Sequence, residues 1–213
     1  MRTGVHILTA KNLPPPVEPF KHDDVSISSR EDLYRGYFRA EKVQFRHRRF
    51  KGDISNTVTR ELFITKGAVS VLLYDPKLDA VVFVEQFRLG ALDSPRSPWQ
   101  LEMVAGMLDK SLPIEEIARR EAMEEAGCDI ASMVRIGSFF TTPGICNERF
   151  HVYAAKVDAS SLAEHGGLDE EHEDIRIHVV PRQQAFAWLD DGHVENAMTV
   201  LALQWLRIHG TNW

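Results

Sequence analysis

Polar and apolar residues alternate along several stretches near the start of the chain, and a proline-rich segment, residues 13–19, precedes them. Alternation with a period of two is typical of strands with one buried face. The proline-rich segment predicts a stiff, extended connector. The alternation predicts an antiparallel N-terminal sheet, with a turn at Lys51-Gly52-Asp53. Its extended stretches are residues 25–30, 34–50 and 54–65.

The rest of the chain mixes extended and helical patterns. Residues 68–74 and 80–87 are β-rich runs separated by Asp75-Pro76-Lys77-Leu78-Asp79, which predicts a hairpin. Further strands are expected at residues 99–104, 134–140, 149–157 and 175–180, a polar loop at 160–174, and helices at about 182–190 and 195–209. With one more helix before Gly127, this order predicts an α/β protein: an α/β/α sandwich with a mixed central sheet.

The central helix has clear start and stop signals. Pro113 suits a first helical turn, where a missing N–H has no effect. Gly127 suits the left-handed residue that ends a helix. Its apolar positions share one face and predict packing against the sheet: Ile114, Ile117, Ala118, Ala122 and Ala126.

Three carboxylates lie on another face of this helix. Glu121, Glu124 and Glu125 are spaced i, i+3 and i+4, so like charges stand close together. A cation relieves that repulsion, and carboxylate oxygens suit Mg²⁺ or Mn²⁺. The alternative is an ordinary charged helix held by Glu–Arg pairs.

Composition narrows the possibilities. The chain has 213 residues, 44% of them apolar, and a net charge of −6. That charge does not suggest a general nucleic-acid surface. Two cysteines are too few for a disulfide framework and indicate a reducing compartment. No apolar run is long enough to cross a bilayer. We therefore expect a cytoplasmic protein without membrane or nucleic-acid partners.

The segment from Gly106 to Cys128 resembles the Nudix box, the loop–helix–loop signature of hydrolases that cleave nucleoside diphosphates linked to another group. The matching residues are Gly106, Arg120, Glu121, Ala122, Glu124, Glu125, Gly127 and Cys128. Leu112 departs from the pattern, because the family has a glutamate there that mainly supports the loop. The likeness to the Nudix domain covers about residues 60–210. The N-terminal sheet resembles the extension of the ADP-ribose pyrophosphatase branch. We therefore expect residues 1–58 to form an N-terminal sheet region and 59–213 the Nudix domain.

The resemblance implies roles for the acidic residues. Glu121 and Glu125 would be the principal metal ligands, Glu124 would assist, and the carbonyl of Ala105 would complete the set. Residues 167–176 resemble the acidic loop of bacterial ADP-ribose diphosphatases, in which Glu171 would polarise the attacking water and Glu173 would join the metal cluster. Glu170 competes for the role of base. The alternative is a solvated acidic loop.

Substrate-binding positions also follow from the resemblance. Arg60 and Arg88 match family positions that hold phosphates or the terminal ribose, and Met107 matches one that lines the pocket. Thr142 is expected at the substrate because Pro143, which follows it, resembles a marker of the ADP-ribose-cleaving branch. Tyr37 or Phe38 could stack on adenine. Surface salt bridges, a simple turn and core packing remain alternatives for these residues.

The sequence thus predicts a Mg²⁺- or Mn²⁺-dependent hydrolase that converts ADP-ribose to AMP and ribose 5-phosphate. Two alternatives stay open. One is hydrolysis of another nucleoside diphosphate sugar, such as GDP-mannose or ADP-glucose. The other is a catalytically silent module that senses such nucleotides, which the leucine at position 112 favours. The branch resemblance also implies a homodimer that packs through the N-terminal sheet.

Overall fold

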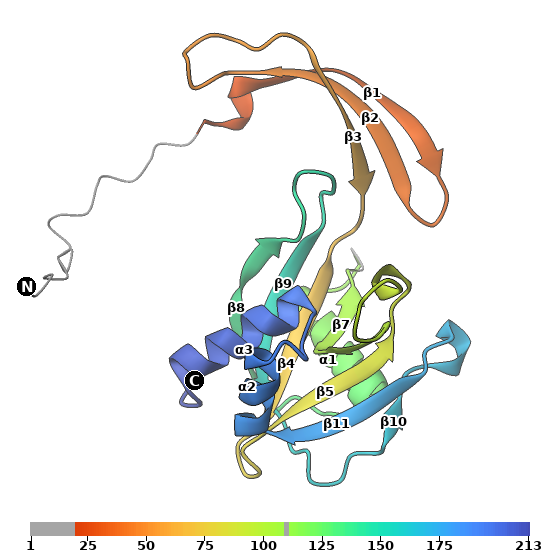
Figure 1. Ribbon diagram of the computed structural model, residues 1–213, viewed down its shortest axis with the longest axis vertical. Coiled ribbons are helices and arrows are strands. Elements are labelled where there is room, and N and C mark those ends of the chain that lie inside the picture. Colours follow the sequence, from red (N-terminus) through yellow and green to blue (C-terminus); the bar gives the residue numbers. More distant parts are fainter. Residues whose placement is uncertain (1–19, 109–110) are drawn as a thin grey trace, which may run out of the picture.

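A computed structural model describes residues 20–108 and 111–213 of the chain. The connector expected at residues 13–19 lies outside the described residues. The described part contains two sheets, one of three strands and one of eight. In Figure 1 the smaller sheet arches above the larger one, and the chain passes from one to the other between β3 and β4.

The N-terminal sheet consists of β1 (Val25–Arg35), β2 (Arg39–His47) and β3 (Val58–Ile64), paired antiparallel in that order. The antiparallel sheet and the turn before Ile54 are therefore as expected. The second extended stretch was predicted to begin at residue 34, and that was wrong. Tyr34 belongs to β1, and the chain reverses at residues 36–38, where Gly36 N–H donates to the carbonyl of Phe38. Every residue of β1 is exposed, so its alternation marks no buried face.

The larger sheet has the order β10–β11–β5–β4–β9–β8, with β6 paired to β5 and β7 to β4. Only β4 and β9 pair in parallel among the described strands, so the sheet is mixed. The strands are β4 (Ala68–Asp75), β5 (Ala80–Phe87), β6 (Trp99–Glu102), β7 (Val104–Met107), β8 (Ser132–Phe140), β9 (Arg149–Lys156), β10 (His165–Gly166) and β11 (Ile175–Pro181).

A single strand was expected at residues 99–104, but the structure divides it at Met103. Strands β4 and β5 pair near their shared hairpin and then separate. The segment after residue 98 lies in the gap, or fork, between these two strands. Its first part, β6, pairs with β5, and its second part, β7, pairs with β4. The strand therefore changes its partner from β5 to β4 at Met103. It delivers Ala105 and Gly106 to the centre of the sheet.

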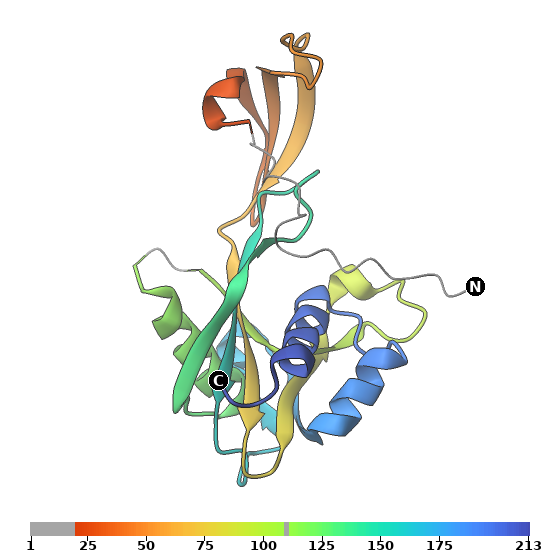
Figure 2. The same cartoon turned by 90° about the vertical axis from the view of Figure 1, so that its left-hand side faces the viewer.

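Helices cover both faces of this sheet, as Figure 2 shows with the sheet between α1 and the pair α2 and α3. Helix α1 (Ile114–Ala126) packs on one face, with Ile117 among Val69, Val82 and Val104. Helices α2 (Arg182–Asp190) and α3 (Ala197–His209) pack on the other, with Leu203 near Phe83. The expected α/β/α sandwich is confirmed. None of the helices in the described ranges has the length and apolarity needed to span a bilayer.

Candidate active site

Helix α1 is fixed at both ends and along one face. Pro113 precedes its first residue, and Gly127 ends it in the left-handed conformation with φ 63°. The N–H of Gly127 donates to the carbonyl of Met123, which closes the last turn. Ile117 and Ala122 are fully buried on the apolar face. Glu121 and Glu125 point to the same side of the helix as these apolar residues, toward the strand that carries Ala105, so the separate acidic face expected from the sequence is wrong for these two carboxylates.

The carboxylates of α1 meet β7 directly. Glu125 is 2% exposed, and its Oε2 accepts a hydrogen bond of 3.1 Å from the N–H of Ala105. A Cβ on residue 106 would overlap the carboxylate of Glu121, so glycine allows that carboxylate to lie against β7, and any other residue would displace it. Arg120 donates to Glu121 at 2.8 Å and lies 3.6 Å from Glu124.

A cavity of about 280 Å³ gathers most of the predicted site residues. Its lining combines α1, β7, the residue after β5, the N-terminal hairpin and the acidic loop. The lining residues are Tyr37, Arg88, Ala105, Gly106, Met107, Arg120, Glu121, Glu124, Glu125 and Glu173. The hydroxyl of Tyr37 is 3.4 Å from the sulfur of Met107 and joins the N-terminal hairpin to the cavity wall. Residues that are far apart in the sequence thus line one acidic cavity.

Arg88, which directly follows β5, lines several neighbouring cavities. It lines this cavity and two neighbouring ones of about 280 and 300 Å³. Its Nε and one terminal nitrogen donate to Glu102 at 3.0 and 2.8 Å. A forked guanidinium with part of its donors held by protein can offer the others to an anion.

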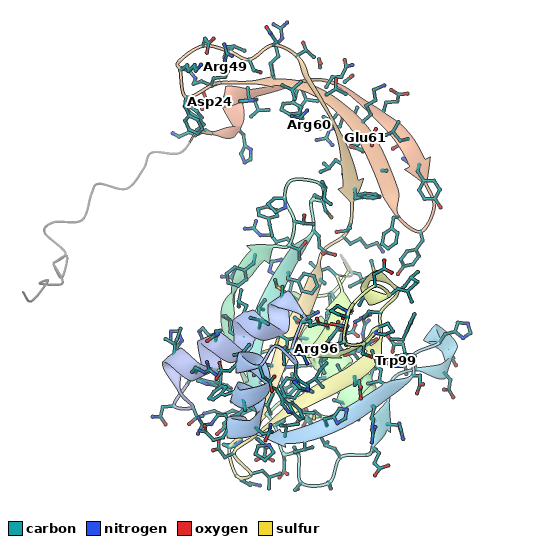
Figure 3. The ribbon with its side chains drawn as sticks, viewed as in Figure 1. Asp24, Arg49, Arg60, Glu61, Arg96 and Trp99 are labelled. Carbon is teal, nitrogen blue, oxygen red and sulfur yellow. The ribbon has the colours of Figure 1, made fainter. Side chains whose placement is uncertain are left out.

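Other predicted residues lie elsewhere. Arg60, on β3, donates to the carbonyl of its neighbour Thr59 and does not line the described cavities; Figure 3 labels it on the N-terminal sheet, away from the domain below. The backbone carbonyl of Thr142 accepts from the N–H groups of Ile145 and Cys146 in a turn. Glu171 lies in a short 3₁₀ helix, Asp169–Glu171, and its side chain lies outside the described part of the structure. Leu112 is partly exposed before α1.

Two residues at the site, Arg120 and Glu102, were not given a role from the sequence. The Arg120–Glu124 pair has i,i+4 spacing, so the motif itself contained that signal. Glu102 gave no comparable signal, because its partner Arg88 is brought to it by strand pairing rather than by sequence spacing. Both arginines satisfy carboxylates around the cavity in the described structure.

Burial raises the pKa of Glu125 to about 8, and the negative charges of Glu121 and Glu173 act in the same direction. The Ala105 hydrogen bond and the charge of Arg88 lower the pKa but do not offset these effects. The carboxylate is therefore held where its negative charge is unfavourable without a nearby cation. Groups in this condition are typical of functional sites.

The donor set fits a hard divalent cation. Carboxylate oxygens from α1 and the acidic loop line the same cavity as the backbone of Ala105, and Mg²⁺ and Mn²⁺ prefer oxygen ligands. Among the described residues, no group of three or more acidic, histidine or cysteine side chains stands ready to hold an ion as placed. Arg120 pairs with Glu121 and Glu124, so these side chains must rotate before their carboxylates can converge on one ion.

A larger cavity, of about 460 Å³, lies elsewhere and is lined by Glu85, Arg96, Trp99, His178 and Trp188, among others. Its polar groups already have protein partners: His178 pairs with Glu85 at 2.8 Å, and Arg96 and His193 both pair with Asp191. It contains none of the helix carboxylates. We therefore place the site in the smaller, acidic cavity, because chemistry rather than volume distinguishes it.

Comparison with known proteins agrees with this geometry. A family profile described as the NUDIX domain matches residues 65–203. The chain belongs to the Nudix family. The recognition made from the sequence is confirmed, and with it the class of Nudix hydrolase.

Curated relatives extend the Nudix match over nearly the whole chain. A protein of Escherichia coli (strain K12) named ADP-ribose pyrophosphatase is 44% identical over 95% of this chain and 96% of its own. One of the same name from Haemophilus influenzae is 42% identical over 91% and 90%. A GDP-mannose pyrophosphatase of Pectobacterium atrosepticum is 30% identical over 87% and 95%. A solved structure described as an ADP compounds hydrolase matches with a TM-score of 0.66 at 19% identity, over 88% and 96%, which bears on the fold alone.

Proposed function

We propose that this Nudix hydrolase cleaves the diphosphate bond of ADP-ribose to give AMP and ribose 5-phosphate. The observation that carries the proposal is the 44% identity, over 95% of the chain, to a protein named ADP-ribose pyrophosphatase. The acidic cavity supports it, because diphosphate hydrolysis needs clustered oxygen ligands beside a phosphate-binding cation.

We propose Mg²⁺ or Mn²⁺ as the cofactor, held by Glu121, Glu124, Glu125, Glu173 and the carbonyl of Ala105. When bound, such an ion neutralises phosphate charge and acidifies a coordinated water. The residues then have separate tasks. Arg120 neutralises Glu121 and Glu124 before they bind a cation. Gly106 keeps the approach between β7 and α1 clear.

Glu171 is our proposed base. It accepts a proton from the attacking water as the oxygen of that water bonds to phosphorus. The bridging P–O bond breaks, and its electron pair leaves with the departing phosphate oxygen, so ADP-ribose and water give the two monophosphates. A base on a surface loop can approach when the substrate has bound. Replacing Glu171 by Gln should lower kcat sharply with less effect on metal affinity; a larger loss in Glu170→Gln would move the role to Glu170.

Substrate contacts complete the proposal. Arg88 donates to the diphosphate, Met107 contacts the terminal ribose, and Tyr37 stacks on the adenine ring. Arg60 and Thr142 lie away from the cavity of their own chain. In a dimer, we propose that they act at the partner subunit's cavity.

The decisive test is product analysis. Purified protein, ADP-ribose and Mg²⁺ or Mn²⁺ are incubated, and AMP and ribose 5-phosphate are separated by chromatography. We expect equal amounts of both products and none after chelation with EDTA. Binding without products would instead identify a nucleotide sensor.

GDP-mannose is the second candidate substrate, because relatives named GDP-mannose pyrophosphatase are 30% identical to this chain. A panel of ADP-ribose, GDP-mannose and ADP-glucose, ranked by kcat/KM, separates the candidates. We expect ADP-ribose to rank first, since the relatives named for it share more residues over more of the chain.

We also propose a homodimer formed through the N-terminal region, residues 1–58, with residues 59–213 as the hydrolase domain. Directly opposed apolar residues cross the small sheet, among them Ile27, Phe45 and Val58. Ile27 is exposed and Phe45 and Val58 are partly exposed, and an apolar row of this kind suits a protein interface. The cytoplasm is the proposed compartment, which the free thiols of Cys128 and Cys146 favour.

A further inference from the structure

Glu102, on β6, is a buried carboxylate outside the metal-binding set. It is 5% exposed, and its Oε2 accepts both bonds from Arg88, at 3.0 and 2.8 Å. A buried carboxylate without partners would be costly, so Glu102 must keep its donors. The pairing fixes which edge of the Arg88 guanidinium faces the protein.

The other oxygen of Glu102 is held by the start of α3. Asn196 Nδ2 donates to Glu102 Oε1 at 3.0 Å. The same side chain caps α3, because its Oδ1 accepts from the N–H and hydroxyl of Thr199, each at 3.0 Å. Thr199 Oγ1 in turn accepts from the N–H of Met103 at 3.0 Å, at the point where the chain changes from β6 to β7. One helix turn therefore supports both Arg88 and the segment that leads to Ala105.

The location of Arg88 shows why such support matters. Arg88 lines the acidic cavity together with Glu125 and Glu173, and its charge already lowers the pKa of Glu125. A guanidinium free to rotate would pair with these carboxylates and compete with a cation. Glu102 provides a carboxylate on the opposite side, lining a neighbouring cavity with Arg88 and Asn196.

We propose that Glu102 and Asn196 are positioning residues for Arg88, which hold its guanidinium off the metal-binding carboxylates and direct its remaining donors to the substrate phosphates. The proposal rests on the proposed function in assigning Arg88 to the diphosphate. In this proposal both residues act on the substrate only through Arg88. Asn196 acts through Glu102, and α3 thereby sets the geometry of a cavity on the other side of the sheet.

The kinetic test separates the two functions of Asn196: its bond to Glu102 and its cap on α3. Asn196→Ser keeps a capping oxygen but removes the amide donor to Glu102. Val200→Ala, in the same helix, removes packing against the core without touching the network, and is the stability control. We expect Asn196→Ser to raise KM for ADP-ribose by about tenfold, the effect of losing one charge-assisted bond. It should also raise the Mg²⁺ concentration for half-maximal rate and leave kcat within about twofold. Val200→Ala should lower Tm and leave KM unchanged.

A second readout does not depend on turnover. The Nε–H of Arg88, held by Glu102, should give a resolved ¹H–¹⁵N resonance in the full-length protein, assigned by its loss in Arg88→Lys. We expect Asn196→Ser and Glu102→Gln to shift or broaden that resonance, and Val200→Ala to leave it unchanged.

The outcomes are distinguishable. An unchanged Arg88 resonance in Asn196→Ser overturns the proposal, as does a KM change of equal size in Val200→Ala. If the resonance moves while the wild-type protein fails to cleave ADP-ribose, positioning stands and the proposed function fails. If wild type cleaves ADP-ribose and Asn196→Ser moves the resonance without raising KM, Arg88 does not bind the substrate and the inference is overturned.

Discussion

The two sheets of this protein are both built largely from antiparallel strands, yet only the larger one encloses a core. Helices cover both faces of the eight-stranded sheet, and residues such as Val71, Leu72 and Phe83 are fully buried. In the N-terminal sheet, β1 contributes no buried residue, and Val43 is the buried apolar residue among its described strands. Hydrophobic burial therefore stabilises one region far more than the other.

The charged groups of the two regions differ in how far they are exposed to solvent. Among the described residues of the small sheet, Glu41 is a buried carboxylate held by Arg30 and Arg39, while the other charged pairs that cross the strands are exposed, as Arg39 with Asp32 and Lys42 with Glu31. Exposed pairs of this kind add little stability, and a small uncovered sheet is only marginally stable by itself. In the large domain, Glu102, Glu125 and Asp75 are buried charges with defined partners. All described lining residues of the acidic cavity except Tyr37 come from the large domain, whereas the small sheet has no α-helix covering either of its faces among the described residues.

The largest effect should come from the acidic cavity. Glu125→Gln keeps an acceptor for the Ala105 N–H but removes the charge, so turnover should fall at least about a hundredfold. Because burial opposes the charge of Glu125, Tm should stay the same or rise. ADP-ribose turnover and calorimetric Tm measure the two effects. Glu116→Gln, on an exposed position of the same helix, is the matched control. Retained activity in Glu125→Gln would refute the metal assignment.

The second effect concerns stability. Asp75 is fully buried and accepts backbone N–H bonds from Lys77, Leu78 and Ala159. Burial raises its pKa, but the three bonds together outweigh burial and leave the pKa below its ordinary value. Asp75→Asn turns an acceptor into a donor facing N–H groups, which should cost about 2 kcal/mol in urea unfolding at neutral pH.

The sign of the pH dependence follows from the lowered pKa. The folded protein holds the proton of Asp75 less tightly than the unfolded chain, so the stabilisation is present above the unfolded value of about 3.9. It is lost as the pH falls through the folded value. Wild type should therefore approach the stability of Asp75→Asn in acid. As a control from the other sheet, Asp53→Asn removes the exposed pair with Arg49 and should leave unfolding unchanged. A similar loss in both variants would erase the contrast between the regions.

The same contrast explains what could be predicted from sequence. Helix α1 and the β4–β5 hairpin were foreseen because their signals are local: Gly127 ends the helix, and Asp75 begins the turn. The carboxylate cluster was equally local, since helical spacing fixes which side chains share a face. Most of the cavity lining followed from the family resemblance.

The remaining features depend on contacts between distant residues. The fork between β4 and β5, which divides the strand expected at residues 99–104, arises from a choice of partners that no local pattern encodes. The Asn196–Glu102 bond joins residues 94 positions apart. In the N-terminal sheet the turn at Gly36 was missed because an exposed strand has no buried face to set its limits.

The third effect concerns association. Ile27 is half exposed and lies opposite Phe45 on β2, so a charge there should cost the isolated chain little. In the proposed dimer, Ile27→Asp should weaken association on the order of tenfold or more, because a desolvated carboxylate would lie in the interface. Sedimentation velocity over a dilution series measures it. Asn56→Asp, at an exposed position between β2 and β3, introduces the same charge and is the matched control. Equal dissociation constants for wild type and Ile27→Asp would remove this row from the interface.

The smallest effect is expected from the hydroxyl of Tyr37, where the two regions meet. Tyr37 is 82% exposed, and its hydroxyl contacts the sulfur of Met107, a weak acceptor. Tyr37→Phe removes that bond and keeps the ring, so KM for ADP-ribose should change less than about twofold. Tyr37→Ala also removes the ring and should raise KM more, since stacking on a base is worth about 1–3 kcal/mol. Comparing the two substitutions separates a mechanical contact from a substrate contact. If Tyr37→Phe alone produced the whole change, the hairpin would act by holding Met107, and the small sheet would serve the cavity as a brace rather than as part of its binding surface.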